Sequence, residues 1–220
     1  MVAQYTYSYF RVSKTDDVQT SARKYRDLRL QALKVSPESF SSTYEIESAF
    51  TEEEWISRLT VENREVFICS AQPLDGSATE WIAQVTVCGP MSEADFTLPI
   101  ESEQPAQKSD EEEERWQMLS LFALLSHRGN GLGGKLCQEA LNYLRTLRSS
   151  PPGVQVRLIV KAGNDITINL YKRLGFVDAG RATLAEALIA NGDSHLLPED
   201  ISIPKFSNRF GIIMLIRLTR

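Results

Sequence analysis

The sequence predicts an α/β fold in which helices flank a sheet of about seven strands. Segments rich in aromatic and β-branched residues alternate along the chain with segments whose apolar residues recur every three or four positions. The chain has 220 residues, 42% of them hydrophobic, which is enough for the core of one domain. We therefore expect residues 1–220 to form a single domain.

Two helices are expected in the first part of the chain. Asp16 or Asp17 is expected to cap the first by accepting a backbone hydrogen bond. The apolar residues on its predicted buried face are Val18, Ala22, Tyr25, Leu28 and Ala32. Thr51 and Glu54 predict a capping box before a short helix that ends near Leu59.

The strand-like segments are residues 5–12, 65–71, 80–89, 116–125, 154–160, a run that begins at Phe176, and 210–218. The second and third should pair antiparallel, since the turn residues Pro73, Asp75 and Gly76 separate them. Helices are expected over residues 132–147 and 164–173, and Gly175 should end the latter in a left-handed conformation.

Residues 91–115 break this pattern. They show no periodicity, and positions 101–115 hold seven acids against two bases. Such a stretch buries too little apolar surface to repay the entropy of ordering. We expect a mobile acidic insertion here, not a domain boundary.

The net charge of −5 argues against general binding to nucleic acid or anionic lipid, because both surfaces repel an acidic protein. Cationic small molecules and basic peptides are easier partners. The first residues lack a secretory signal, and no window is apolar enough to span a membrane, so a cytoplasmic protein is expected, with a nuclear location open. Three cysteines without CxxC spacing predict reduced structural thiols, and neither His127 nor His195 has metal-ligand spacing.

A glycine-rich turn, HRGNGLGGKL at residues 127–136, lies between a predicted strand and a predicted helix. Glycines leave backbone N–H groups accessible, and the start of a helix favours an anion. The turn therefore predicts a phosphate site. It also fits G-x-G-x-x-G, but residues 148–163 contain no acid for a ribose hydroxyl. It fits G-x-x-x-x-G-K as well, yet Leu136 follows where a magnesium-binding hydroxyl belongs, so a phosphate-loop nucleotide binder is the weaker alternative.

Two motifs resemble a known family. Arg128-x-x-Gly131-x-Gly133 resembles the pyrophosphate loop of the GNAT N-acetyltransferase superfamily. The later segment N-x-x-T-x-x-L-Y-x-x-L-G-F at residues 164–176 resembles that superfamily's second motif, with Thr167 in place of the usual alanine. Residues 28–40 are similar to its first helices. The motifs follow the family's order and spacing.

The resemblance implies a GNAT fold, in which a mixed, mostly antiparallel central sheet of about seven strands has a splay between the fourth and fifth strands. It implies that acetyl-CoA, as cosubstrate and without a metal, donates an acetyl group to a primary amine of a small molecule or peptide in a ternary complex. The protein would be a monomer or a homodimer. A noncatalytic acyl-CoA-binding sensor of the same fold is the main alternative, and the acceptor is not predictable from the sequence.

The resemblance also assigns site residues. The backbone of Leu121, Phe122 and Ala123 would bind the pantetheine amides, and Ala123 N–H is the candidate donor to the oxyanion. Tyr171 occupies the general-acid position. The remaining coenzyme-binding residues would be Arg128, Gly129, Asn130, Gly131, Leu132, Gly133, Gly134 and Asn164.

Other charged residues are weaker candidates. Glu114 and Glu80 could serve as a base, and Glu45 and Glu47 could attract a cationic substrate, although each is expected first of all to be a solvated surface carboxylate. His127 is expected to face solvent. Possible outer phosphate contacts are Lys135, Lys172 and Arg173.

Overall fold

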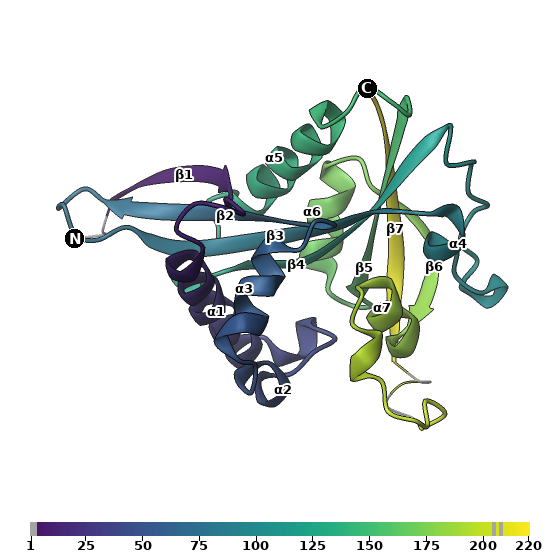
Figure 1. Ribbon diagram of the computed structural model, residues 1–220, viewed down its shortest axis with the longest axis horizontal. Helices are drawn as coiled ribbons and strands as arrows, with labels where there is room; N and C mark the ends of the chain where they lie inside the picture. The colour runs from purple at the N-terminus through teal and green to yellow at the C-terminus, as the bar shows by residue number, and fades with distance from the viewer. Residues whose placement is uncertain (1–3, 204–205, 207–208) are drawn as a thin grey trace. The chain divides into compact units, whose positions relative to one another are not determined.

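The computed structural model describes residues 4–203, 206 and 209–220 of the chain. Within them a seven-stranded sheet has the order β1-β2-β3-β4-β5-β7-β6 (Figure 1). The strands are β1 (Tyr5–Arg11), β2 (Arg64–Pro73), β3 (Glu80–Met91), β4 (Glu113–Ala123), β5 (Gly153–Lys161), β6 (Val177–Thr183) and β7 (Phe210–Thr219). β4 and β5 are parallel, whereas β1 on β2, β5 on β7 and β6 on β7 are antiparallel. The predicted mixed sheet is confirmed.

The parallel register of β4 on β5 runs from Glu113 opposite Gly153 to Gln117 opposite Arg157. Beyond Arg157, β5 continues to Lys161 with β7 as its antiparallel partner. The parallel register therefore covers only the first residues of each strand. The predicted splay would separate the two strands beyond these residues.

Helices lie between most of the successive strands. The helices are α1 (Val18–Val35), α2 (Tyr44–Ser48), α3 (Glu52–Thr60), α4 (Glu93–Phe96), α5 (Leu132–Thr146), α6 (Asp165–Arg173) and α7 (Leu184–Ala190). Short 3-10 turns are η1 (Pro37–Ser39), η2 (Ile100–Ser102), η3 (Leu125–His127) and η4 (Ser194–Leu196). The capping box of α3 is confirmed: Thr51 Oγ1 accepts from Glu54 N at 3.2 Å, and Glu54 Oε2 accepts from Thr51 N at 2.6 Å.

The start of α1 differs from the prediction. Asp17 stands at the N-cap position with φ 45°, and its side chain accepts no hydrogen bond from the helix. An N-cap residue normally has extended backbone angles, which aim its side chain at the first turn. Ser13 Oγ instead accepts from Thr15 N at 3.3 Å and from Asp16 N at 3.0 Å. Side-chain capping by Asp16 or Asp17 was a wrong prediction.

Two compact units divide the chain: Met1–Val87 with Ser120–Leu141, and Cys88–Leu119 with Asn142–Arg220. The first holds β1, β2 and α1 to α3, and the second holds α4, α6, α7 and β5 to β7. A single domain stays a prediction.

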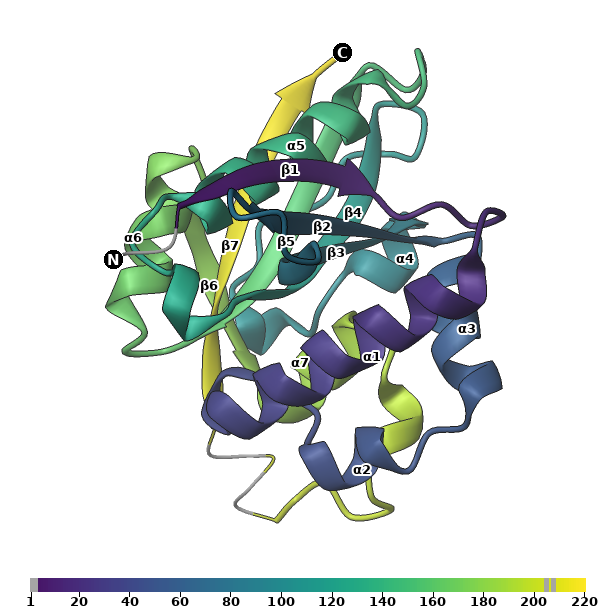
Figure 2. The same cartoon turned by 90° about the vertical axis from the view of Figure 1, so that its left-hand side faces the viewer.

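In the first unit, α1, α2 and α3 lie together on one side of β1 and β2 (Figure 2). Tyr25 of α1 and Trp55 of α3 are 1% and 2% exposed, and their ring centroids are 6.0 Å apart. Of the predicted buried face of α1, Ala22, Tyr25, Leu28 and Ala32 are buried, and Val18 is half-buried. The helical period thus identified the packed face correctly.

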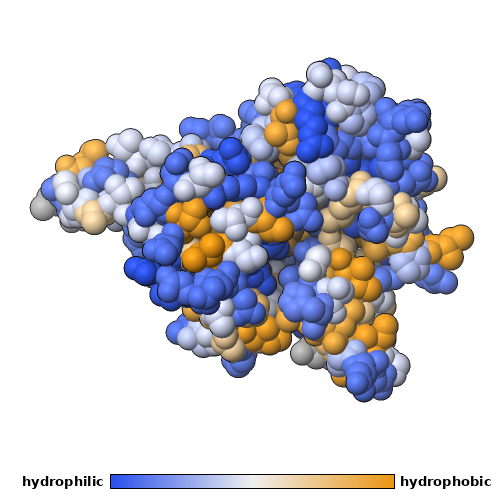
Figure 3. Space-filling view, viewed as in Figure 1, coloured by the Kyte–Doolittle hydropathy of each residue, from blue (hydrophilic) through white to orange (hydrophobic). Residues whose placement is uncertain are grey.

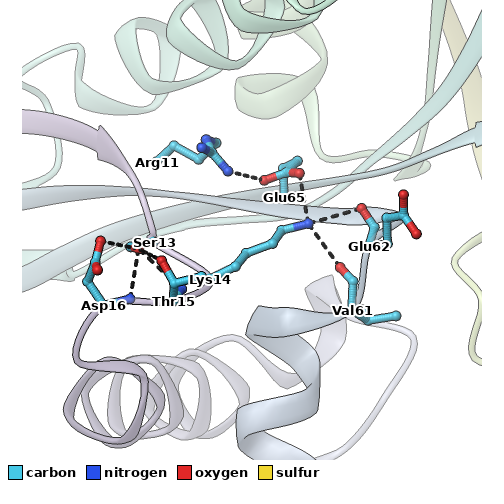
Figure 4. Close-up of polar contacts among 8 residues, drawn as sticks. All are labelled: Arg11, Ser13, Lys14, Thr15, Asp16, Val61, Glu62 and Glu65. Atoms are coloured by element: carbon cyan, nitrogen blue, oxygen red, sulfur yellow. Dashed lines mark hydrogen bonds and ion pairs between the residues drawn. The ribbon is translucent and has the colours of Figure 1, made fainter.

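A polar cluster fixes the segment between β1 and α1 (Figure 4). Glu65, whose side chain is 9% exposed, forms ion pairs with Arg11 and Lys14, each at 2.8 Å. Lys14 Nζ also donates to the carbonyl oxygens of Val61 and Glu62, each at 3.0 Å. Lysine has three donors, and these contacts occupy all of them. The cluster therefore ties the loop after β1 to the chain that enters β2.

In the second unit, β5, β7 and β6 run side by side (Figure 1). An apolar cluster fills one region of this unit, and its buried members are Phe96, Leu98, Ala179, Ala182, Ile213 and Leu215. Phe96 and Leu98 come from the segment between β3 and β4, where the sequence shows no periodicity. That segment thus contributes side chains to the core.

A buried arginine holds the same segment. Arg157 of β5 is 0% exposed. Its guanidinium donates to Phe96 O at 2.5 Å, to Gln117 Oε1 at 2.7 Å and to Gln104 Oε1 at 3.2 Å. Burial lowers the pKa of Arg157 to about 9. Composition alone does not reveal these contacts, because their donor lies on a distant strand. The mobility of residues 91–115 stays a prediction.

The face of the molecule shown in Figure 3 is mostly hydrophilic, and apolar side chains gather over α7 and in other patches. Ile189 of α7 is 51% exposed. In the described part of the chain, no helix has both the length and the apolar character needed to cross a membrane.

Candidate functional site

The loop between β4 and α5 has the backbone geometry that its glycines predict. Gly129 and Gly131 have φ angles of 86° and 72°, in the left-handed region that favours glycine. A Cβ atom added to Gly129, Gly131 or Gly134 would meet no non-neighbouring heavy atom within 4 Å. The space beside these glycines is therefore open to a ligand.

The start of α5 presents backbone donors to that space. Lys135 N donates to Gly131 O at 3.1 Å, which closes the first turn. The N–H groups of Leu132, Gly133 and Gly134 precede this bond and have no partner within the helix. Leu132 is buried at 4% exposure and anchors the turn, while the residues from Gly129 to Gly131 are exposed. Such a helix start favours an anion.

Arg128 precedes the glycines and is exposed. Its Nε donates to Ala123 O at 3.0 Å, and its Nη2 donates to Ser36 Oγ at 3.5 Å. The guanidinium carbon lies 5.6 Å from the centre of the Phe122 ring. In this structure Arg128 therefore links the end of β4 to the end of α1. Asn130 spans the loop, because its Nδ2 donates to His127 O at 3.1 Å.

Ser120 is the irregular residue of β4. Its φ is 60°, a left-handed conformation that costs a non-glycine residue roughly 1–3 kcal/mol. Leu121, Phe122 and Ala123, the residues predicted to bind pantetheine, follow it directly. Phe122 is buried, and Leu121 and Ala123 are half-buried. A residue with a strained backbone conformation thus lies directly before the predicted coenzyme contacts.

Two side chains contact Ser120. Gln84 Nε2 donates to Ser120 O at 3.4 Å, and Arg29 Nη1 donates to Ser120 Oγ at 3.4 Å. Gln84 is 0% exposed and Arg29 is 4% exposed. The irregular residue is therefore held by buried groups from β3 and α1.

Arg29 is itself fixed by Glu47. Arg29 Nε donates to Glu47 Oε2 at 2.9 Å, and Arg29 Nη2 donates to Glu47 Oε1 at 2.6 Å. Burial alone would raise the pKa of Glu47, but the hydrogen bonds and charge of Arg29 outweigh it, and the pKa lies below its ordinary value. Glu47 is 0% exposed, so the expectation of a solvated carboxylate was wrong.

Sequence reasoning missed the role of Arg29, although a signal was present. The arginine shares the buried face of α1 with Ala22, Tyr25 and Ala32. A charged residue inside an apolar stripe is rarely buried without a partner. The partner itself, on a separate short helix, could not be read from the pattern.

His127 corrects another expectation. It was expected to face solvent, but it is 3% exposed. Its Nδ1 lies 3.3 Å from Tyr7 Oη, and its ring packs edge-on against Tyr5 with centroids 4.7 Å apart. The turn η3 directs the ring toward aromatic side chains of β1. Those partners lie far away in the sequence, so local pattern did not predict them.

The second motif lies in the second unit. Asn164 caps α6, with Oδ1 accepting from Thr167 N at 3.4 Å. Tyr171 is 6% exposed and packs edge-on against Phe176 with centroids 5.6 Å apart. Gly175 ends the helix with φ 97°, as predicted. Tyr171 is therefore firmly placed on a short, capped helix.

The predicted candidates for a base differ in their surroundings. Glu114 is 5% exposed and pairs with Arg148 at 3.0 Å and with Arg220. It is therefore not solvated, as was expected, but paired with two arginines. Glu80 is exposed at the start of β3. Glu45 is exposed, and backbone and side-chain hydrogen bonds lower its pKa.

The predicted outer phosphate contacts are exposed cations. Lys135 Nζ lies 5.0 Å from the centre of the Tyr9 ring, and Lys172 pairs with Asp178 at 3.1 Å. Arg173 and His195 are exposed. Cys69, Cys88 and Cys137 are buried without disulfides, and burial raises the pKa of Cys137 to about 12. That thiol is not a nucleophile at neutral pH.

Residues 97–176 match the sequence profile of a family described as the Acetyltransferase (GNAT) family. This range contains both the glycine loop and the α6 motif. No curated protein sequence matches the chain.

Solved structures share the fold. An acetyltransferase of the GNAT family from Streptococcus pneumoniae has a TM-score of 0.59 at 15% identity, with 97% of this chain and 100% of that chain covered. NAA60 from Arabidopsis thaliana in complex with acetyl-CoA has 0.55 at 14%, with 97% and 99% covered. Spermidine N-acetyltransferase from Vibrio cholerae in complex with CoA and spermine has 0.51 at 12%, with 96% and 95% covered. At these identities the likeness shows the fold alone.

Proposed function

We propose that this chain, whose residues 97–176 match the acetyltransferase (GNAT) family, transfers an acetyl group from acetyl-CoA to a primary amine. Both substrates would be bound together, and the amine nitrogen would attack the thioester carbonyl directly. The nitrogen forms a bond to the acetyl carbon, the carbon–sulfur bond breaks, and CoA leaves as a thiolate. The observation that carries the proposal is the open glycine loop at the start of α5.

The loop would hold the coenzyme pyrophosphate. A Cβ atom on Gly129, Gly131 or Gly134 would meet no heavy atom within 4 Å, so phosphate oxygens can approach the backbone N–H groups of this loop closely. Arg128 would add a charged donor by exchanging its long contact to Ser36 for a phosphate oxygen. Asn130 and Leu132 would serve mainly to shape the turn, the first through His127 O and the second through its burial.

The end of β4 would bind the pantetheine arm. Backbone groups of Leu121, Phe122 and Ala123 would form strand-like hydrogen bonds to its amides. Ala123 N–H is proposed as the donor to the oxyanion that forms when the amine attacks. Removing one such donor typically costs about 3 kcal/mol of transition-state stabilisation.

Tyr171 is proposed as the general acid. The leaving thiolate has a solution pKa near 8.5 and a phenol near 10, so proton donation assists departure without being obligatory. Packing against Phe176 would keep the ring in one orientation. Asn164 would support this element through its cap on α6, in addition to the coenzyme contact that its motif implies.

The attacking amine must lose a proton, because a primary amine with a pKa near 10.4 is almost fully charged at neutral pH. The carboxylates of Glu47 and Glu114 are already paired with arginines. We therefore propose Glu80 or a water relay as the proton acceptor. A net charge of −5 suits a cationic acceptor, either a small amine or a peptide amine.

A thiol-release assay tests the proposal. Acetyl-CoA and longer acyl donors would be offered with polyamines, small amines and peptides that carry a free N-terminus or a lysine. Amine-dependent release of CoA from acetyl-CoA is expected. Binding of acetyl-CoA without release, with every acceptor, would indicate a sensor. Thermal protection by magnesium nucleotide but not by acetyl-CoA would indicate a nucleotide binder and would contradict the proposal.

A further inference from the structure

The left-handed conformation of Ser120 requires a cause within its surroundings. In strand β4 a serine has no intrinsic preference for φ 60°. Two buried donors meet this one residue, Gln84 Nε2 at the carbonyl and Arg29 Nη1 at the hydroxyl, each at 3.4 Å. Side chains of β3 and α1 thus bind the carbonyl and the hydroxyl of Ser120, respectively.

The guanidinium of Arg29 has little conformational freedom, so it can hold Ser120 in one position. Glu47 binds Nε and Nη2 side-on at 2.9 and 2.6 Å, which leaves Nη1 directed at Ser120. The Phe40 ring lies 4.6 Å from the guanidinium carbon. The side chains of Arg29 and Glu47 are 5% and 0% exposed. A planar fork held in this way determines where its third nitrogen points.

We propose that the Arg29–Glu47 ion pair is a positioning device for the coenzyme strand: it holds Ser120 in the left-handed conformation and so fixes the backbone of Leu121, Phe122 and Ala123. The proposal rests on the proposed function, in which those three residues bind pantetheine. Arg29 and Glu47 are positioning residues and touch neither substrate. A purely structural ion pair would stabilise the fold without any specific effect on the strand.

Replacement of Arg29 by lysine separates charge from geometry. Lysine keeps the positive charge beside Glu47 but lacks the planar fork, so it cannot hold Glu47 and Ser120 in one arrangement. Arg26→Lys is the matched control, because Arg26 lies on the same helix, its side chain is 42% exposed, and it pairs with its neighbour Asp27 at 3.0 Å. Acetyl-CoA binding would be measured by calorimetry, and thiol release would supply KM and kcat.

Ser120→Gly provides the decisive comparison. Glycine adopts a φ of 60° without strain, so in its presence the ion pair is no longer needed to hold that conformation. We expect Arg29→Lys alone to raise the dissociation constant of acetyl-CoA roughly fivefold or more. In the Ser120→Gly background the same change should have an effect of less than about twofold. Arg26→Lys should bind like the unchanged protein.

Amide hydrogen exchange of the protein without coenzyme gives a readout independent of activity. Arg29→Lys should speed exchange in peptides that cover residues 119–124, while peptides from α5 keep their rates. This result is expected whether or not the protein transfers acetyl groups. Failure of the unchanged protein to bind acetyl-CoA would overturn the proposed function, and the exchange data would still test the positioning of the strand.

The inference is overturned if Arg29→Lys lowers the melting temperature but leaves both the coenzyme affinity and the exchange at residues 119–124 unchanged. It is also overturned if the effect of Arg29→Lys is equally large in the Ser120→Gly background. Either result would mean that the Arg29–Glu47 ion pair only stabilises the fold.

Discussion

Replacement of Gly131 by alanine is the sharpest probe of the glycine loop. Gly131 has φ 72°, and an added Cβ would meet no heavy atom within 4 Å, so the substitution creates no clash. Only backbone strain remains, and it amounts to roughly 1–2 kcal/mol for an L residue in the left-handed region. If the strained loop relaxes in the free protein, coenzyme binding must restore its conformation. The dissociation constant of acetyl-CoA should then rise about 5- to 30-fold.

Gly76→Ala is the matched control for this experiment. Gly76 has φ 83° in the turn between β2 and β3, and its Cβ position is equally open. Each variant should melt lower by about 2–4 °C for each kcal/mol of strain that remains in the free folded protein. Only Gly131→Ala should lose affinity for acetyl-CoA in a calorimetric titration. Equal affinities in the two variants would refute the claim that this loop holds the coenzyme.

Three further predictions concern the general acid and the buried charges. Tyr171→Phe should lower kcat about 100-fold, which is at the low end for a general acid because a thiolate leaves readily. The dissociation constant of acetyl-CoA should be unchanged. An equal loss of kcat and of coenzyme affinity would contradict the acid role. Glu47, whose folded pKa lies below its ordinary value of 4.5, contributes stability that is present above that value and is lost as pH falls through the folded pKa. In urea unfolding, Glu47→Gln should therefore have a lower free energy of unfolding at pH 7 than the unchanged protein. Below about pH 4.5 its free energy of unfolding should fall less steeply with pH. Parallel plots of this free energy against pH for the two proteins would contradict the pairing. Lys14→Met should reduce the free energy of unfolding by about 1–3 kcal/mol, because it removes an ion pair with Glu65 and two hydrogen bonds to carbonyl oxygens. An unchanged urea midpoint would show that the cluster in Figure 4 does not stabilise the fold.

The fold was largely predictable because its determinants are local. Apolar periodicity located α1 and its buried face, and Thr51 with Glu54 defined the start of α3. Gly175 ends α6 in a left-handed conformation because α6 needs a residue without Cβ at that point. The cap of α1 failed as a prediction, since two adjacent aspartates and a nearby serine can compete for the same N–H groups.

The site could be predicted from the sequence only where its functional groups come from consecutive residues. The open glycines of the loop follow from composition and position. The contact between His127 and Tyr7 and the pairing of Arg29 with Glu47 join separate elements. The left-handed conformation of Ser120 is imposed by tertiary contacts and has no sequence marker of its own.

Backbone amides at the start of α5 are proposed to bind the diphosphate of acetyl-CoA. A crystal structure of the protein with this coenzyme would test that contact. We expect diphosphate oxygens about 2.7–3.2 Å from backbone nitrogens between Gly129 and Gly134. A coenzyme bound with its diphosphate elsewhere, and the glycine loop empty, would contradict it.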